Sequence, residues 1–259
     1  MRLPIYQIDA FASRVFGGNP AAVVPLESWL PDGVMQAIAA ENNLAETAFF
    51  VPEGEGYALR WFTPTVEVDL CGHATLASAH LILSKIAPGR EQVRFNTRSG
   101  PLTVTRQGDM LALELPSRPP EPCPTPSGLE AAFGKAPKAV LAARDYLLVY
   151  ESESDIRGLK PDMARIAALD RFAVIVTAPG SDCDFVSRFF APAQGIPEDP
   201  VTGSAHCTLI PYWSKRLGKR GLSARQLSPR GGELLCEDRG ARVVVAGKSV
   251  LYLEGAIFV

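Results

Sequence analysis

The chain has 259 residues, of which 47% are hydrophobic and 21% charged, and its formal net charge at neutral pH is −2. This composition is typical of a globular protein, and the length suits one large domain or two of about 130 residues each. A near-neutral chain without a basic stripe lacks the electrostatic surface for nucleic-acid binding. No apolar stretch reaches about 18 residues, the length needed to span a membrane.

The N-terminus and the cysteines indicate the compartment. Residues 1–9 carry Arg2 within an apolar run and lack the shape of a signal peptide. The five cysteines are scattered and odd in number, without a Cys-x-x-Cys pair, which is typical of a reduced, intracellular protein. We therefore expect a cytoplasmic protein that does not associate with membranes.

In the first half of the chain, short alternating apolar runs predict strands, and two segments predict helices. The helices are expected over 32–42 and 72–86, and the second is apolar or small on every side, so it should be buried. The strands are predicted over 4–11, 21–24, 47–51, 57–62, 93–97, 102–106 and 110–115.

A proline-rich segment interrupts this pattern. Six of the eleven residues between 116 and 126 are proline, which lacks an N–H and fixes φ, so we predict a stiff linker that runs outside sheets and helices. Beyond it, a helix is expected over 203–217, which Pro211 should kink or shift in register. The strands of this half are predicted over 139–142, 146–150, 172–177, 184–190, 233–237 and 242–245.

Sequence blocks of the first half recur in the second. Residues 60–64 (RWFTP) match 188–192 (RFFAP), Gly72 matches Gly203, and an Arg-x-Gly-x-Leu motif recurs, with offsets of 128, 131 and 132 residues. A nearly constant offset indicates a duplicated domain, which places a site where the two copies face each other. The predicted domains are an N-terminal repeat (1–115), a linker (116–127), a C-terminal repeat (128–248) and a C-terminal strand returning to the first domain (249–259).

Many short strands around one buried helix, twice, predict an α+β fold in which each domain wraps a curved, mostly antiparallel sheet around a central helix. The N-termini of these helices, at Gly72 and Gly203, carry unpaired N–H groups that suit a carboxylate or an oxyanion. Glycine also lets a ligand approach the backbone closely. His73 and Ser204 follow and can bind the same ligand. The alternative is that the glycines only ease packing and that His73 is a hydrogen-bonded core residue.

Two acids are candidates for proton transfer. Glu46 directly precedes a very apolar strand, where burial favours the protonated form of a carboxyl group and suits a general acid or base; a solvent-facing or capping role is the alternative. The matched residue in the second copy is Val174. Asp199 lies four residues before Gly203, on a predicted loop that contains the insertion between the copies. The alternative to a catalytic role is that Asp199 is a solvated acid of this loop.

Cys71 precedes Gly72 at a helix N-terminus, a location that lowers the pKa of a thiol. It could act as a nucleophile or base, or serve as a small buried hydrophobe. Its match in the second copy is Thr202, which is too weak an acid to be its partner. The three histidines lack the spacing of a helical metal site, so we expect no metal.

Six motifs occur together between about residue 5 and the C-terminus: 9–11 (DAF), 18–21 (GNPA), 43–47 (NLAET), 71–75 (CGHAT), 188–192 (RFFAP) and 198–206 (EDPVTGSAH). Together they resemble the phenazine-biosynthesis isomerase (PhzF-like) family. The resemblance implies the diaminopimelate-epimerase-like fold, a homodimer, and no cofactor or metal. It also implies isomerisation of trans-2,3-dihydro-3-hydroxyanthranilate by proton movement between ring carbons.

The resemblance assigns roles to residues of this chain. Glu46 is the acid/base, with His73 and Asp199 as further catalytic residues. The residues expected to bind the substrate are Gly72, Gly203, Ser204, Cys71 and Asn19. Related epimerases use one cysteine from each half, and because Thr202 fills the second position, a two-thiol racemase is disfavoured.

The sequence thus predicts an isomerase that needs no cofactor and acts on a small anionic, carboxylated metabolite, with Glu46 moving a proton between carbons. Two alternatives stay open. One is an amino-acid racemase or epimerase that uses Glu46 or Cys71 with Asp199. The other is a member without turnover that binds a metabolite or a protein.

Overall fold

The computed structural model describes all 259 residues, which fall into two compact units. Unit 1 comprises Met1–Glu114 and Ala246–Val259, and unit 2 comprises Leu115–Val245. The proline-rich segment is thus part of unit 2 instead of a separate linker. None of the helices is both long and apolar enough to cross a membrane.

Unit 1 consists mainly of strands, with two helices. Its helices are α1 (Asp32–Asn42) and α2 (Gly72–Leu81), and a π-helical turn (Ile82–Ile86) extends α2. Its strands are β1 (Arg2–Ala10), β2 (Asn19–Pro25), β3 (Glu46–Glu53), β4 (Gly56–Phe62), β5 (Glu67–Val68), β6 (Gln92–Thr97), β7 (Gly100–Gln107), β8 (Met110–Pro116) and β18 (Ser249–Phe258).

Unit 2 has the same kinds of elements but four helices, three of which are short. The helices are α3 (Leu129–Phe133), α4 (Glu153–Gly158), α5 (Met163–Ala167) and α6 (Gly203–Leu217), and Pro192–Gln194 form a 3-10 turn. The strands are β9 (Glu121–Pro122), β10 (Ala139–Ala142), β11 (Tyr146–Val149), β12 (Val174–Pro179), β13 (Phe185–Ala191), β14 (Ile196–Asp199), β15 (Gly221–Gln226), β16 (Gly232–Asp238) and β17 (Arg242–Gly247).

The strand pairing repeats between the units. In unit 1, β1–β2 are antiparallel, β2–β3 parallel, β3–β4 antiparallel, β4–β6 parallel and β6–β7 antiparallel. In unit 2, the same sequence of pairings joins β10–β11, β11–β12, β12–β13, β13–β15 and β15–β16. The duplication inferred from the offsets is therefore a duplication of topology.

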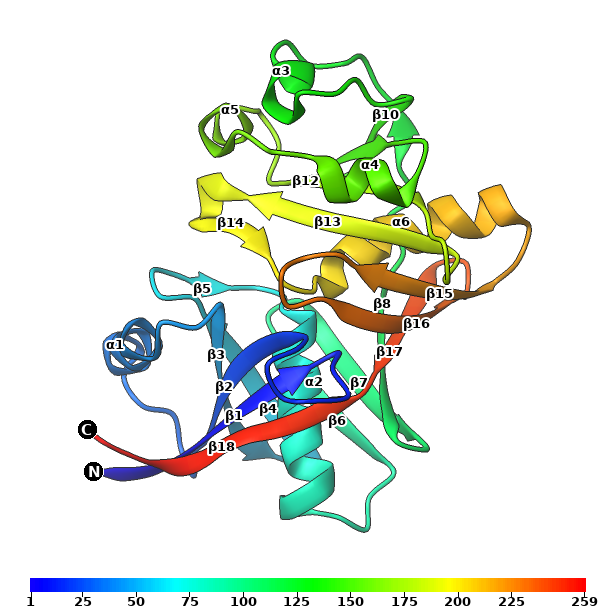
Figure 1. Ribbon diagram of the computed structural model, residues 1–259. Helices are drawn as coiled ribbons and strands as arrows, with labels where there is room; N and C mark the ends of the chain where they lie inside the picture. Colours follow the sequence, from blue (N-terminus) through cyan, green and yellow to red (C-terminus); the bar gives the residue numbers. More distant parts are fainter. The chain divides into compact units, whose positions relative to one another are not determined.

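In each unit, one further strand pairs antiparallel with the first strand of the repeated set. The C-terminal strand β18 pairs antiparallel with β1, so the two ends of the chain lie side by side (Figure 1). In unit 2 the corresponding strand is β9, which pairs with β10 through Pro122 and Glu121. The expectation that the proline-rich segment stays outside the sheet is therefore wrong for these two residues. The sheet accommodates Pro122, which has no N–H to donate, because the pairing is only two residues long.

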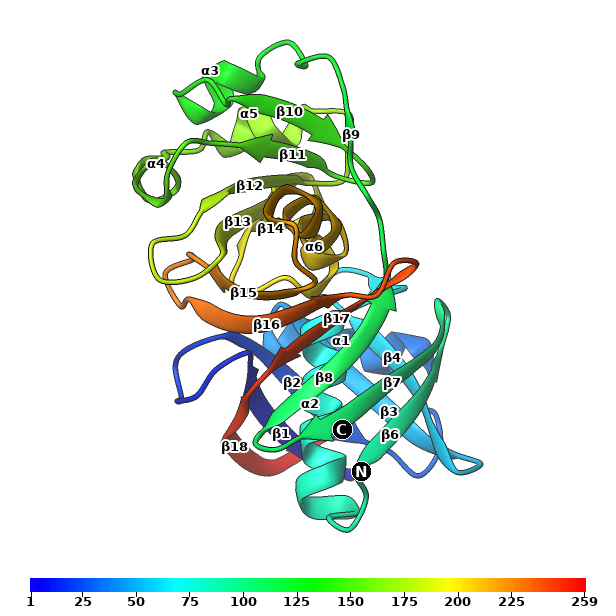
Figure 2. The ribbon, with the colours of Figure 1, turned by 90° about the vertical axis from the view of Figure 1, so that its right-hand side faces the viewer.

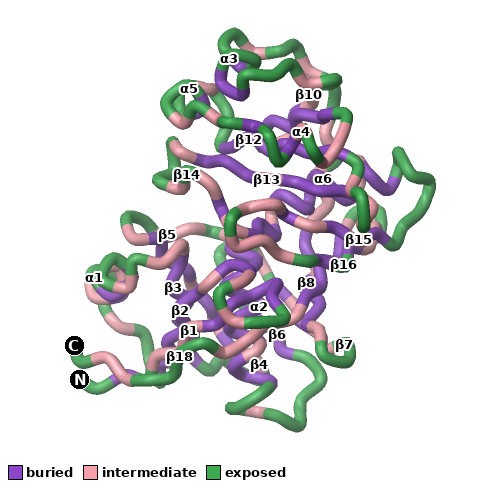
Figure 3. Tube along the Cα trace, viewed as in Figure 1, coloured by how far each residue is buried: buried purple, intermediate pink, exposed green.

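A helix lies inside the curved sheet of each unit. Nine of the ten residues of α2 are buried (Figure 3), because its small and apolar side chains leave no polar face. Figure 2 looks along α6 and shows β12, β13, β14 and β15 around it.

Helix α6 continues through Pro211 to Leu217. Proline cannot donate to the carbonyl four residues earlier, which here belongs to Cys207. The backbone N–H of Arg118 donates to that carbonyl at 2.8 Å instead. The chain segment that enters unit 2 thereby satisfies the hydrogen bond that the proline removes.

Candidate active site

Glu46 is the first residue of β3, where it is paired with Ala21 of the parallel strand β2. Its side chain is 11% exposed. The acid that precedes the apolar strand is therefore buried with it, and the alternative of a solvent-facing acid is wrong.

His73, the second residue of α2, lies next to Glu46. The distance from His73 Nε2 to Glu46 Oε2 is 3.1 Å, and the imidazole is 5% exposed. Neither atom has a hydrogen bond of good angle, although both are buried. Buried polar atoms without such a bond cost about 1–3 kcal/mol each, so they are typical of sites where a ligand completes the hydrogen bonding.

The other ring nitrogen of His73 faces Asn19 and Cys71. Its Nδ1 lies 3.1 Å from the side-chain amide of Asn19 and 3.6 Å from Cys71 Sγ. The amide nitrogen donates to a neutral ring, and rotation of the amide by 180° presents its oxygen to a protonated one. Asn19 thus suits both charge states of His73.

The charge of His73 depends on its neighbours. Burial opposes the imidazolium, and a thiolate at Cys71 would favour it only at high pH, since the pKa of that thiol is about 11. Glu46 is the charge that acts near neutral pH, and Cys71 and Glu46 together raise the pKa of His73 well above the ordinary value against the effect of burial. The geometry therefore gives a buried ion pair between a carboxylate and an imidazolium.

The expected activation of Cys71 is wrong. Burial, with the negative charge of Glu46 adding to it, raises the pKa of the thiol to about 11, although the residue directly precedes the first turn of α2. The helix end contributes less than the loss of water around the sulfur. Near neutral pH, Cys71 is a neutral thiol beside His73.

The fold also brings potential metal ligands together, which the spacing of the histidines does not reveal. One ligand atom each of Glu46, Cys71 and His73 lie within 4.8 Å of one another. A metal ion binds one ring nitrogen at about 2.0–2.1 Å, whereas the thiol and the carboxylate contact opposite nitrogens here. The three side chains as they lie here therefore do not surround one common ion position.

The two central helices begin at the predicted glycines. Cys71 precedes Gly72 in α2, Thr202 precedes Gly203 in α6, and neither forms a side-chain cap on the first turn. The N–H groups of these turns keep their partial positive charge, which suits an anionic group.

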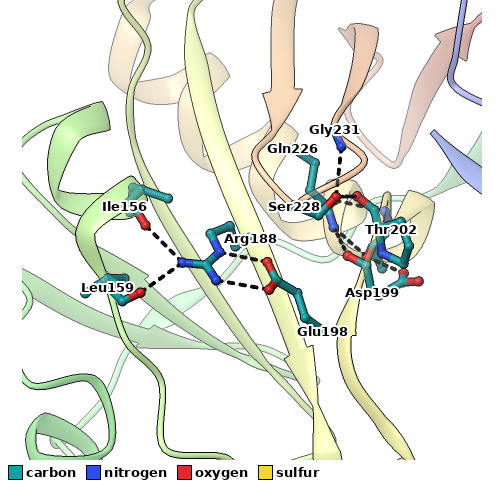
Figure 4. Close-up of polar contacts among 10 residues, drawn as sticks. Ile156, Leu159, Arg188, Glu198, Asp199, Thr202, Gln226, Ser228 and Gly231 are labelled. Atoms are coloured by element: carbon teal, nitrogen blue, oxygen red, sulfur yellow. Dashed lines mark hydrogen bonds and ion pairs between the residues drawn. The ribbon is translucent and has the colours of Figure 1, made fainter. Parts of the chain in front are cut away.

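In unit 2, Asp199 ends strand β14 and is buried, so the prediction of a loop acid is wrong. Its neighbour Glu198 forms a two-pronged ion pair with Arg188, with Nε–Oε1 and Nη2–Oε2 distances of 2.7 and 3.0 Å (Figure 4). Unit 1 has the same pair between Glu67 and Arg60, with both distances 2.7 Å.

This correspondence locates the insertion. Glu198 matches Glu67 and Pro192 matches Pro64, so the three extra residues lie between Pro192 and Glu198, where the 3-10 turn Pro192–Gln194 begins this segment. In the sheet, Phe189 is paired with Asp199 as Trp61 is with Val68. Asp199 thus replaces a valine of the first copy, and the inserted turn does not supply it.

Ser204, the second residue of α6, matches His73. Its hydroxyl lies 3.4 Å from Nη2 of Arg144. Asp145 orients that guanidinium by accepting from Nε and Nη2 at 3.0 Å each, and the ring of Phe172 lies 4.4 Å below it. The positive charge of Arg144 therefore lies close to the start of α6.

Sequence reasoning missed three residues around these positions: Arg144, Thr202 as a hydrogen-bonding residue, and Gln226. A signal for Gln226 exists. In β15, Leu222, Ala224 and Gln226 alternate with exposed or half-buried residues and are buried, so the apolar alternation places a polar amide on the inner face.

Comparison with known proteins agrees with this architecture. The family model described as phenazine biosynthesis-like protein matches residues 8–255. An uncharacterized isomerase of Pseudomonas aeruginosa is 54% identical over 257 residues, which cover 99% of each chain. The crystal structure of a PhzF-family phenazine biosynthesis protein of Enterococcus faecalis has a TM-score of 0.97 at 49% identity, with 100% of both chains covered.

A more distant structure shares the fold alone. The hydroxyproline epimerase of Agrobacterium vitis, solved with bound trans-4-hydroxy-L-proline, has a TM-score of 0.65 at 9% identity, covering 99% of this chain and 92% of that one. The predicted fold class is thereby confirmed.

Proposed function

The chain belongs to the phenazine biosynthesis-like family and is an isomerase, and we propose that it moves a proton between two carbons of a small carboxylated substrate, with Glu46 as the acid/base. One observation carries this proposal. The buried Glu46 Oε2 lies 3.1 Å from His73 Nε2 and lacks a hydrogen bond of good angle, so a carboxylate oxygen is kept dry and available.

The chemistry follows from the charge states. The Glu46 carboxylate accepts the proton of an acidic C–H bond, and the electron pair left on carbon delocalises into the unsaturated substrate. The carboxylic acid formed then returns the proton to another carbon, and the carboxylate is restored. The imidazolium of His73 stabilises the ionised carboxylate before and after this cycle.

Binding of the substrate involves the helix N-termini in this proposal. Gly72 in unit 1 and Gly203 with Ser204 in unit 2 begin helices whose N–H groups attract negative charge. Asn19 and Cys71 contact the ring of His73, so their effect on a substrate is mainly to hold that ring. Asp199 is proposed as a further catalytic residue on its burial and on the family motif around it.

A racemase that uses two thiols has less support. Cys71 is a neutral thiol near neutral pH, and Thr202 stands at the matched position of the second copy. A single carboxylate that both removes and returns the proton needs no second base, which fits the absence of an acid at Val174.

The test is turnover of trans-2,3-dihydro-3-hydroxyanthranilate, followed by chromatography, with Glu46→Gln and the control Glu41→Gln. Glu41 is exposed in α1, so its variant should keep the wild-type rate, while Glu46→Gln should lose about 10²-fold or more. Equal rates for the wild type and Glu46→Gln would refute the role of Glu46.

Two further parts of the proposal concern the whole enzyme. Activity should survive prolonged treatment with EDTA, because the proposed steps use the residues of this chain alone. We also propose that the enzyme is a homodimer, so light scattering should give twice the chain mass of 27.8 kDa.

A further inference from the structure

Three buried polar residues meet where β14 leads into α6. Asp199 ends the strand, Thr202 precedes the helix, and Gln226 ends β15; they are 6%, 6% and 0% exposed. The family motif gives Asp199 a role, but it assigns none to Gln226 or to the hydroxyl of Thr202.

The backbone determines the orientation of the Gln226 amide. Its Oε1 accepts from the backbone N–H of Thr202 at 2.9 Å, which only an oxygen can do. The amide nitrogen therefore lies at the other end, where Nε2 donates to the Asp199 carbonyl at 2.8 Å and to Thr202 Oγ1 at 3.0 Å.

The direction of the next hydrogen bond follows. Thr202 Oγ1 accepts from Gln226 Nε2, which has no acceptor capacity, so the hydroxyl hydrogen points elsewhere. It is donated to Oδ2 of Asp199 in a short contact (Figure 4). Hydrogen-bond donation thus runs one way, from Gln226 through Thr202 to Asp199.

We propose that Thr202 and Gln226 are positioning residues for Asp199, which hold its carboxylate in one orientation and keep it in the ionised, hydrogen-bond-accepting form. A hydroxyl that donates to a carboxylate stabilises the charged form, and a hydroxyl fixed by a second donor cannot turn away. The catalytic consequence rests on the role proposed for Asp199; the hydrogen-bond relay itself does not.

The surrounding loop supports the relay. Ser228 Oγ donates to the Pro200 carbonyl at 2.8 Å and accepts from the Gly231 N–H at 3.1 Å. The first copy has no counterpart of this hydrogen-bond relay. Val68 stands there at the position of Asp199, and Cys71 at the position of Thr202. The relay therefore belongs to the second copy alone.

Three ionisable side chains lie on the elements next to Asp199. On β14 and β13, Glu198 and Arg188 form an ion pair. On α6, His206 Nδ1 lies 2.8 Å from the Thr202 carbonyl, and burial lowers the pKa of His206 to about 4. His206 is thus neutral above that pH and adds no charge change to the titration of Asp199 at higher pH.

The direct test is the titration of Asp199 by carbon NMR of protein labelled with ¹³C-carboxyl aspartate, with the signal assigned through Asp199→Asn. Thr202→Val removes the hydroxyl at nearly constant volume, and Thr202→Ser keeps it. The matched control is Thr177→Val, which makes the same change at a buried threonine of β12 whose hydroxyl donates to the Val186 carbonyl.

We expect the titration midpoint of Asp199 to rise by about 1 to 2 pH units in Thr202→Val, the amount that a hydrogen bond to a charged group contributes. Thr202→Ser and Thr177→Val should keep the wild-type midpoint. Gln226→Met should give a smaller rise, because it frees the hydroxyl without removing it. An unchanged or lower midpoint in Thr202→Val would overturn the proposal. Thr202→Ala, with a smaller side chain, gives the same test if the valine variant does not fold.

Turnover of trans-2,3-dihydro-3-hydroxyanthranilate separates this proposal from the function. Thr202→Val should lower kcat/KM, and Thr202→Ser should restore it. If the midpoint shifts while the wild type shows no turnover, the relay is right and the proposed function is wrong. If turnover occurs and the midpoint does not shift, the function stands and the relay is refuted.

Discussion

Replacement of Arg188 by lysine should strongly destabilise unit 2. The guanidinium makes four hydrogen bonds, two to Glu198 and two to the carbonyls of Ile156 and Leu159 at 3.2 Å each (Figure 4). The pair is largely buried, with side chains 12% and 17% exposed. A lysine keeps the charge but loses the planar fork, and with it at least two of these bonds.

The loss of two bonds to a buried charge predicts a decrease of about 3 to 5 kcal/mol in the free energy of unfolding. Urea unfolding followed by circular dichroism measures it. Activity should fall as well, because Glu198 anchors the strand that ends in Asp199.

The matched control is Arg165→Lys on α5, where the ion pair with Asp162 is exposed on both sides. Exposed pairs contribute about 0–1 kcal/mol, so this variant should resemble the wild type. If Arg188→Lys costs no more than the control, Arg188 does not hold β14 in place and the reasoning is wrong.

Two other predictions concern charge states in unit 1. Burial opposes a charge on His73, but Cys71 and Glu46 together raise its pKa above the unfolded value near 6.5. Its contribution to stability is therefore complete below about pH 6.5 and is lost as the pH rises through the folded-state pKa. We expect the stability advantage over His73→Gln to fall by at most about 1.4 kcal/mol per pH unit in urea titrations; an advantage that grows with pH would contradict this. Cys71, with a pKa of about 11 through burial, should stay unmodified by iodoacetamide at pH 8 until urea unfolds the chain. If peptide mass mapping finds Cys71 modified in the folded enzyme, the buried, neutral thiol is refuted.

The sequence predicts the longer elements well, because their patterns are strong. The helices expected over 32–42 and 203–217 coincide with α1 and α6, and that over 72–86 corresponds to α2 with its π-helical turn. A helix without a polar face, such as α2, must be buried, here inside its curved sheet.

Short elements were not predicted, because few residues carry little periodicity. Helices α3, α4 and α5 have five or six residues each, and β5 and β9 have two. For two of these helices, the capping residues at the N-terminus are a signal in the sequence. Ser152 and Asp155 form a capping box at α4, and Asp162 caps α5.

The contacts and charge states within the site could not be predicted from the sequence. The motifs single out Glu46 and His73, but their contact depends on how β3 and α2 come together, which no local pattern records. The pKa of Cys71 rises instead of falling because burial outweighs the helix end, and burial is a property of the fold. Gln226 could have been found from its place on the inner face of β15.

In the proposed mechanism, one acid, Glu46, carries a proton between two carbons of the substrate. The most direct measurement is proton NMR of trans-2,3-dihydro-3-hydroxyanthranilate with the enzyme in D₂O, with Glu46→Gln and Glu41→Gln alongside. We predict isomerisation with deuterium uptake at the carbon that receives the proton, in the wild type and Glu41→Gln but not in Glu46→Gln. Deuterium uptake that persists in Glu46→Gln would contradict the central claim.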